Sequence, residues 1–305
     1  MDVEKSGERL VTKRIFTYLG ITFLITYLYE FLLVYPVALS KNPMVSGFST
    51  LLIAVVMFVP ALGVLLTRLI TKEGFHNAWL RPNFKGHIRY YLIGWFAPLV
   101  LTLIGMGIYF LIYPDQFDGN LGFLQRTIEA AGQEISVTAL RVTMLAQLGM
   151  AILLGPLLNA VNCFGEEWGW RGYLLPKMAE KFKIGWVLLI NGIIWGLWHA
   201  PITAIGHNYG MGYKGWPVTG ILAMCVFCTV VGVIFSYITL KTGSCLPAVL
   251  GHGGLNAIAA IGIYCTKDGG NPFVGPSPTG IIGGSAFIVT ALIMAVLLIL
   301  SLIHI

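Results

Sequence analysis

Charged side chains are scarce in this sequence. Only 10% of its 305 residues are Asp, Glu, Lys or Arg, and 57% are hydrophobic, whereas soluble domains carry about 25% charged residues. So few charges cannot cover the surface of a water-soluble globule of this size. The chain is also too apolar to remain disordered. The composition excludes both classes and predicts a polytopic membrane protein.

Motifs of several familiar enzyme and metal-site classes are missing as well. The five cysteines, Cys163, Cys225, Cys228, Cys245 and Cys265, are odd in number and lie in or beside apolar segments. Cys225 and Cys228 have CxxC spacing, but no second pair accompanies them, so we expect buried thiols and no zinc or redox motif. The chain has no HExxH sequence, and no Ser or Cys lies beside a basic residue in a nucleophile motif. A serine or cysteine protease is therefore disfavoured.

Apolar segments, by contrast, are abundant. Eight of them are long enough to cross a bilayer, at residues 15–39, 47–71, 91–113, 142–164, 184–205, 219–240, 246–265 and 281–305. Helices are expected because lipid offers no partner to free backbone groups, and the segments lack the alternation of a membrane barrel. No repeat or long linker divides the chain. We expect residues 1–305 to form one all-α integral membrane domain of about eight helices.

The basic residues are distributed unequally between the two ends of this predicted bundle. With the N-terminus in the cytoplasm, the cytoplasmic segments contain Lys5, Arg9, Lys13, Arg14, Arg68, Lys72, Arg81, Lys85, Arg89, Arg171, Lys177, Lys181, Lys183 and Lys241. The opposite side contains Lys41, Arg126, Arg141, Lys214 and Lys267. This asymmetry follows the positive-inside rule and explains the net charge of +6. We expect a multi-pass protein of a prokaryotic plasma membrane, with both termini cytoplasmic and no nucleic-acid partner.

Polar residues interrupt the apolar segments at four places. Ionisable groups are costly in a membrane and mark functional sites. The four are Glu166-Glu167-Trp168-Gly169-Trp170-Arg171, Trp195-Gly196-Leu197-Trp198-His199, His252-Gly253-Gly254-Leu255-Asn256 and Glu30. We expect the first three to line one interior cavity, because each polar group is expensive if it is left unpaired.

The spacing within these clusters predicts which side chains act together. Residues four apart share a helix face, so Glu167 can pair with Arg171 while Glu166 points about 100° away and stays available. Trp195 and His199 share a face in the same way, as do His252 and Asn256. Glu30 lies among tyrosines typical of an interfacial belt. His207 and Asn208 fall in an outer loop, where we expect them to be solvated.

A carboxylate, two imidazoles and a carboxamide are the groups required for hydrolysis of an amide by water. Glu166 can take a proton from water, and one histidine can orient that water. The other histidine and Asn256 can donate hydrogen bonds to the oxyanion, and each donor typically stabilises the transition state by about 3 to 4 kcal/mol.

The ordered set Glu166-Glu167-x-x-x-Arg171, Trp195-x-x-x-His199 and His252-x-x-x-Asn256 resembles the CAAX protease and bacteriocin-processing (CPBP or Abi) family, which includes the type II CAAX prenyl endopeptidases. The motifs fall within residues 140–260. The resemblance implies an intramembrane endopeptidase in which Glu166 and His199 activate water, His252 and Asn256 stabilise the oxyanion, and Glu167 and Arg171 hold the first motif in shape. Trp195 stands where the family usually has Phe and is expected to reshape the pocket.

The substrate implied is a prenylated (CAAX) or other hydrophobic peptide or protein, cleaved near its C-terminus at the cytoplasmic side, with entry from the bilayer. We expect no cofactor. The alternatives are a zinc-dependent protease with Glu166, His199 and His252 as ligands, a non-catalytic bacteriocin self-immunity protein of the same family, and a small transporter, although no paired broken helices indicate one.

The depths of the two histidines disagree in this prediction. His252 lies about 9 Å into segment 246–265, whereas His199 lies about 22 Å into segment 184–205, at 1.5 Å per residue. Either the fifth span begins after an interfacial helix at 174–183, or that span is tilted.

Overall fold

The computed structural model describes the backbone of residues 2–303 and the side chains of residues 7–301. Every regular element in that range is helical, which confirms the all-α prediction. The first half contains α1 (Asp2–Tyr29), η1 (Glu30–Val34), α2 (Tyr35–Ala38), α3 (Pro43–Gly47), α4 (Ser49–Val56), α5 (Val59–Ile70), α6 (Ile88–Ile112), η2 (Pro114–Gln116), α7 (Gly122–Ala130) and α8 (Val137–Leu153). The second half contains α9 (Gly155–Leu158), α10 (Ala160–Gly169), η3 (Trp170–Leu174), α11 (Leu175–Ala179), α12 (Ile184–Trp198), α13 (Ala200–Ala204), α14 (Val218–Thr242), α15 (Leu246–Ile258), α16 (Ile261–Tyr264) and α17 (Ser285–Ile303).

The eight apolar segments all contain helices. Five helical stretches are long and apolar enough to cross a membrane, namely Gly7–Ala38, Pro43–Ile70, Ile88–Ile112, Val218–Thr242 and Leu246–Tyr264. Three shorter apolar helices, Val137–Leu153, Ile184–Trp198 and Ser285–Ser301, account for the remaining segments. The last two residues of the predicted span 281–305 and the side chain of Lys5 lie outside the described residues.

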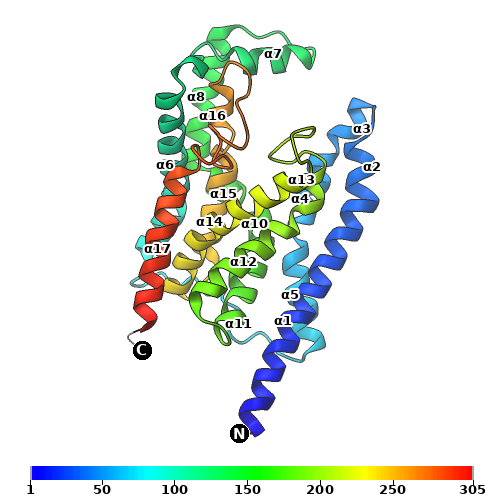
Figure 1. Ribbon diagram of the computed structural model, residues 1–305, viewed down its shortest axis with the longest axis vertical. Coiled ribbons are helices and arrows are strands. Elements are labelled where there is room, and N and C mark those ends of the chain that lie inside the picture. The colour runs from blue at the N-terminus through cyan, green and yellow to red at the C-terminus, as the bar shows by residue number, and fades with distance from the viewer. Residues whose placement is uncertain (1, 304–305) are drawn as a thin grey trace.

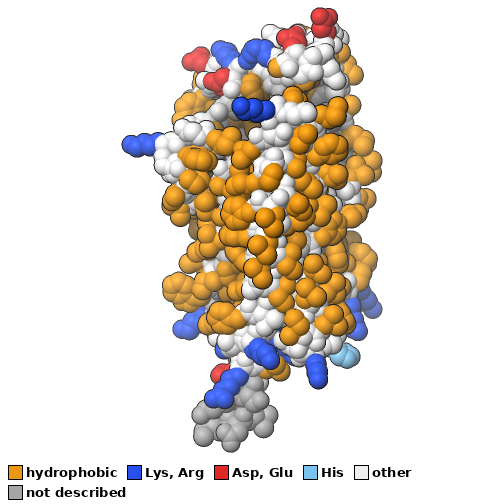
Figure 2. All heavy atoms as spheres, turned by 90° about the vertical axis from the view of Figure 1, so that its right-hand side faces the viewer, with side chains coloured by type: hydrophobic (Ala, Val, Ile, Leu, Met, Phe, Trp, Pro, Cys, Tyr) orange, Lys and Arg blue, Asp and Glu red, His pale blue; other side chains and the backbone are white. Residues whose placement is uncertain are grey.

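The helices run lengthwise in an elongated bundle (Figure 1). Both ends of the chain lie at one end of the bundle, and α7 lies at the other. Figure 2 shows a broad belt of hydrophobic side chains around the middle, with charged side chains gathered above and below it. This distribution is that of a multi-pass membrane protein, because an apolar belt matches the hydrocarbon core and charges match its aqueous borders.

The fourth predicted span, 142–164, differs from the structure at its C-terminal end. Helix α8 ends at Leu153, just before Pro156, which lacks the N–H that a helix interior requires. The chain then resumes as α10 and continues through η3 into α11, ending at Ala179. The predicted end of this span at residue 164 is therefore wrong, and Glu166 lies within the continuing helix, buried inside the bundle. The helix can continue there because its buried polar side chains find partners on other helices.

Small residues bring the helices around the cavity close together. A Cβ at Gly192 or Gly196 of α12 would collide with the backbone of α14 at Thr229 or Cys225. This is the close packing that small residues four apart allow between membrane helices. Helix α12 begins at Ile184, as the sequence predicted, so the alternative of a later start after an interfacial helix is wrong. The other alternative, a tilted span, stays a prediction.

Candidate active site

The carboxylate of Glu167 joins two of the three motifs. This side chain is fully buried on α10. Its Oε1 accepts a hydrogen bond from Nη1 of Arg171 at 3.2 Å, which confirms the predicted pair. The same oxygen accepts a hydrogen bond from Nδ1 of His252 on α15 at 2.9 Å. Glu167 thus orients a histidine in addition to holding its own motif in shape.

Arg171 lies in η3 and is fully buried between aromatic rings. Its guanidinium carbon lies 4.0 Å from the ring centroid of Trp195 and 5.6 Å from that of Phe235. A cation over an aromatic face is stabilised electrostatically, and more strongly when water is excluded. The contact explains how a buried cation is accommodated here with a single carboxylate partner.

Glu166 is held by Trp195 of α12. The indole Nε1 of Trp195 donates a hydrogen bond to Oε2 of Glu166 at 2.7 Å. No partner among the described residues contacts Oε1, and Glu166 lines a cavity. Trp195 therefore fixes the carboxylate while leaving one oxygen free, which a phenylalanine cannot do because its ring has no donor.

Both histidines lie close to Trp195, with ring centroids 5.8 Å (His199) and 5.5 Å (His252) from its ring. His199 Nδ1 lies 2.8 Å from the carbonyl oxygen of Trp195. Because a carbonyl only accepts, Nδ1 carries the proton, and Nε2 of neutral His199 is an acceptor. His252 Nδ1 likewise donates to a carboxylate, so its Nε2 is also directed elsewhere.

The predicted site residues meet at one cavity of about 320 Å³. Glu166 from α10, His199 from the end of α12, and His252 and Asn256 from α15 all line it, together with Trp195. Asn256 is exposed toward this space, and its Nδ2 lies 3.6 Å from Sγ of Cys163. The structure therefore brings the three motifs together, while Glu167 and Arg171 lie buried behind the cavity.

Two of three further polar residues differ from expectation. His207 lines the same cavity and is only partly exposed, so the prediction that it is solvated is wrong. Asn208 also lines it, although it is exposed as predicted. Glu30 has 0% exposure, and neither carboxylate oxygen has a hydrogen-bond partner among the described residues. Its placement in an interfacial tyrosine belt is therefore wrong. It lies in the π-helical segment η1, a feature frequent at functional sites.

A metal centre requires at least three ligand side chains at bonding distance. Within the residues that the structure describes, no three His, Cys, Asp or Glu side chains come together in that way. Glu166, His199 and His252 share the cavity without forming such a group. Their described arrangement does not fit a zinc site, and we derive no step through a metal.

Residues 148–258 match the family model described as Type II CAAX prenyl endopeptidase Rce1-like. The predicted resemblance is confirmed. All seven residues discussed above as site or supporting groups, from Glu166 to Asn256, fall inside this Rce1-like segment. Among curated proteins, CAAX prenyl protease 2 of Methanococcus maripaludis is 26% identical over 88 residues, which are 28% of this chain and 32% of the relative. The chain thus spans about a third of the length of the curated relative that it matches.

Proposed function

We propose that this protein is a membrane-embedded endopeptidase that uses Glu166 to activate water. The observation that carries the proposal is the convergence of Glu166, His199 and His252 from α10, α12 and α15 on one cavity. An ionisable group inside a membrane bundle is costly, and three at one cavity favour a reaction over a purely structural role.

The first step is the attack of water on the peptide carbonyl carbon. The free Oε1 of Glu166 takes one proton of the water as its oxygen bonds to that carbon. The lone pair on Nε2 of His199 accepts a hydrogen bond from the second proton and so orients the water. Trp195 keeps the carboxylate in place during this step, because it donates to the other oxygen of Glu166.

The second step is the collapse of the tetrahedral intermediate. Its oxyanion accepts hydrogen bonds from Nδ2 of Asn256 and from Nε2–H of protonated His252. Glu167 stabilises that imidazolium through Nδ1, in the way that a buried carboxylate supports a catalytic histidine in other hydrolases. The C–N bond then breaks, and the proton held by Glu166 passes to the leaving amine.

The surroundings of the site favour a hydrophobic substrate. Apolar side chains, among them Val56, Ile202 and Leu255, form much of the cavity wall. A second, mainly apolar groove of about 610 Å³ lies between α8 and α15–α16 and shares Asn256 with the cavity. A prenylated or otherwise apolar peptide would place its hydrophobic part in this groove, which is also open to the bilayer along the exposed face of α8.

The decisive test is cleavage of quenched fluorescent peptides by the detergent-purified protein. We expect Glu166→Gln to lower kcat at least 100-fold, because general base catalysis contributes about 10² to 10⁴. Glu129→Gln, at an exposed glutamate of α7 outside the cavity, is the matched control and should keep wild-type activity. Equal activity in Glu166→Gln would refute the mechanism. A folded wild type that binds peptides without cleaving them would favour the self-immunity alternative.

The same assay decides between the metal-free and the zinc-dependent mechanism. We expect activity to survive a chelator, since the acid, base and oxyanion donors above are all protein groups. Loss on chelation followed by recovery with zinc would instead support Glu166, His199 and His252 as ligands.

A further inference from the structure

The cavity reaches the end of the bundle opposite the chain termini. Its lining includes the buried Glu166 and His252 and also Asn208 and Thr279. Asn208 follows α13 and Thr279 precedes α17, and these connections lie on the side away from N and C (Figure 1). Two lining residues are exposed: Asn256, which the cavity shares with the groove beside α8, and Asn208, which places an aqueous mouth at this end.

Helix α1 and its continuation through η1 and α2 provide a measure of depth. The hydroxyls of Tyr27 and Tyr35 donate to the carbonyl oxygens of Leu197 and Pro201, each at 2.8 Å, so His199 lies level with the residues between the two tyrosines. This helical run ends at Ala38. At 1.5 Å per residue, the level of His199 is roughly 10 Å from the end of α2, and α7 lies beyond that point (Figure 1).

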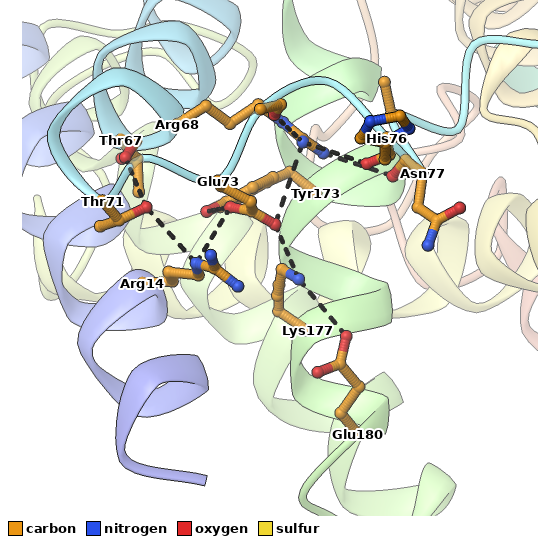
Figure 3. A network of polar contacts seen from close by, with 12 residues as sticks. Arg14, Thr67, Arg68, Thr71, Glu73, His76, Asn77, Tyr173, Lys177 and Glu180 are labelled. Atoms are coloured by element: carbon orange, nitrogen blue, oxygen red, sulfur yellow. Dashed lines mark hydrogen bonds and ion pairs between the residues drawn. The ribbon is translucent and has the colours of Figure 1, made fainter. Parts of the chain in front are cut away.

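The end that holds the termini is closed beneath the site. Trp170, Arg171 and Tyr173 of η3 are each at most 1% exposed. Below them, the carboxylate of Glu73 forms ion pairs with Nε of Arg14 at 3.4 Å and Nζ of Lys177 at 2.8 Å. It also accepts a hydrogen bond from the hydroxyl of Tyr173 at 2.8 Å. Figure 3 shows this network joining α1, the loop after α5, η3 and α11.

A pocket of about 1120 Å³ does open at that closed end, between α11 and the loop at 75–83. It shares no lining residue with the catalytic cavity. Trp168 of α10 contacts this loop, because its indole N–H donates a hydrogen bond to the carbonyl oxygen of Ala78 at 3.0 Å. The pocket therefore gives no access to Glu166.

The two connections that carry Asn208 and Thr279 pack on each other. The ring of Phe273 stacks on Tyr209 with centroids 4.9 Å apart, and Tyr213 contacts the same ring edge-on at 4.9 Å. The hydroxyl of Tyr209 also donates to the carbonyl oxygen of Thr279 at 3.3 Å. These contacts hold the two lining residues together at the end away from the termini.

The charge asymmetry assigns this mouth to one side of the membrane. Apart from Arg171, which is buried beside Trp195, 13 of the 19 Lys and Arg residues belong to the segments at the end that holds the termini and 5 to the other end. The positive-inside rule places the end with the termini in the cytoplasm. We infer that the cavity opens to the extracytoplasmic side, and that the substrate is an extended apolar peptide segment presented there. The side on which the cavity opens does not depend on the proposed function, whereas cleavage of a peptide there does. The inference replaces the expected cleavage at the cytoplasmic side.

Cysteine labelling of intact cells tests the side of the mouth without any enzymatic readout. Cys265, the one native cysteine that is not buried, is first replaced by serine in all variants. Asn208→Cys is then compared with two exposed controls, Glu134→Cys at the α7 end and Lys85→Cys at the end with the termini. We expect a membrane-impermeant maleimide to label Asn208→Cys and Glu134→Cys in intact cells, and Lys85→Cys only after permeabilisation. Labelling of Asn208→Cys only after permeabilisation would overturn the inference.

Cleavage by intact cells tests the substrate side directly. A membrane-impermeant quenched peptide with an apolar centre is added outside cells that express the wild type or Glu166→Gln. We expect glutamate-dependent cleavage outside, and loss of it when Asn208→Cys is blocked with the maleimide but not when Glu134→Cys is. Cleavage that requires lysis would refute the inference while leaving the proposed function intact. Absence of cleavage in detergent would refute the function, and the labelling would still report where the cavity opens.

Discussion

The buried pair of Glu167 and Arg171 leads to a prediction that separates stability from function. Within the described residues, Oε2 of Glu167 and both Nε and Nη2 of Arg171 have no hydrogen-bond partner. A buried ion pair with incomplete hydrogen bonding repays little of its desolvation cost, and well-packed apolar replacements are often neutral or stabilising. We therefore expect the pair to serve the orientation of His252 more than the stability of the fold.

The magnitudes follow from what each substitution leaves behind. Glu167→Met leaves the Arg171 guanidinium buried without a carboxylate, and we expect this to lower the unfolding free energy by about 3 to 5 kcal/mol. Arg171→Met leaves Glu167 with only His252 and also removes the contact with Trp195, worth about 1 to 2 kcal/mol, so a loss of about 3 kcal/mol is expected. The double variant leaves neither charge, and we expect its unfolding free energy to be within about 2 kcal/mol of wild type.

The assay is reversible unfolding in mixed detergent micelles titrated with dodecyl sulfate, followed by the fluorescence of the eight tryptophans. The four proteins form a double-mutant cycle, and the expected coupling free energy is at least about 3 kcal/mol. The double variant should be folded yet inactive, because His252 has lost the acceptor for Nδ1. Additive losses in the double variant would refute the reasoning, since they would show that each side chain stabilises the fold independently.

Three further predictions concern single residues. Trp195→Phe removes the hydrogen bond to Glu166 and should lower kcat about tenfold or more, whereas Trp186→Phe, on an exposed face of α12, should not; equal kcat values in the two variants would assign the indole N–H no role. Glu30→Leu removes a buried carboxylate without partners and should raise the unfolding free energy by about 1 to 3 kcal/mol, so a lower value would show that this carboxylate stabilises the fold. Burial alone would raise the pKa of Glu73, but hydrogen bonds from Lys177 and Tyr173 and the charges of Lys177 and Arg68 outweigh it and hold the pKa below its ordinary value of 4.5. The stabilisation is then complete above that value and is lost as pH falls through the folded-state pKa. The thermal midpoint of the wild type should therefore fall more steeply on acidification than that of Glu73→Gln, and parallel curves would contradict this.

The sequence predicted those parts of the fold that depend on local pattern. Runs of apolar residues located all eight segments, and four-residue spacing paired Glu167 with Arg171. The hydrogen bond from His252 to Glu167 joins residues 85 apart, and no local pattern specifies such a contact. The motif order predicted that the three helices would meet, but it did not reveal which atoms would touch.

The errors arose where a local pattern had two physical interpretations. The tyrosines around Glu30 look like an interfacial belt, yet two of them, Tyr27 and Tyr35, donate to carbonyl oxygens near the site. Polar residues from Glu166 onward resemble the end of a span at residue 164, although pairing between helices allows α10 to continue to Gly169. His207 lies in a loop, but that loop folds over the cavity. In each case tertiary contacts decided between solvent and interior.

The aromatic contacts among Tyr209, Tyr213 and Phe273 have a consequence for how the molecule opens locally. Phe273 packs on both tyrosines, so the connection after α13 and the connection before α17 share one apolar contact. We expect these two connections to open as one cooperative unit, and the amide hydrogens of both would then exchange with solvent at similar rates.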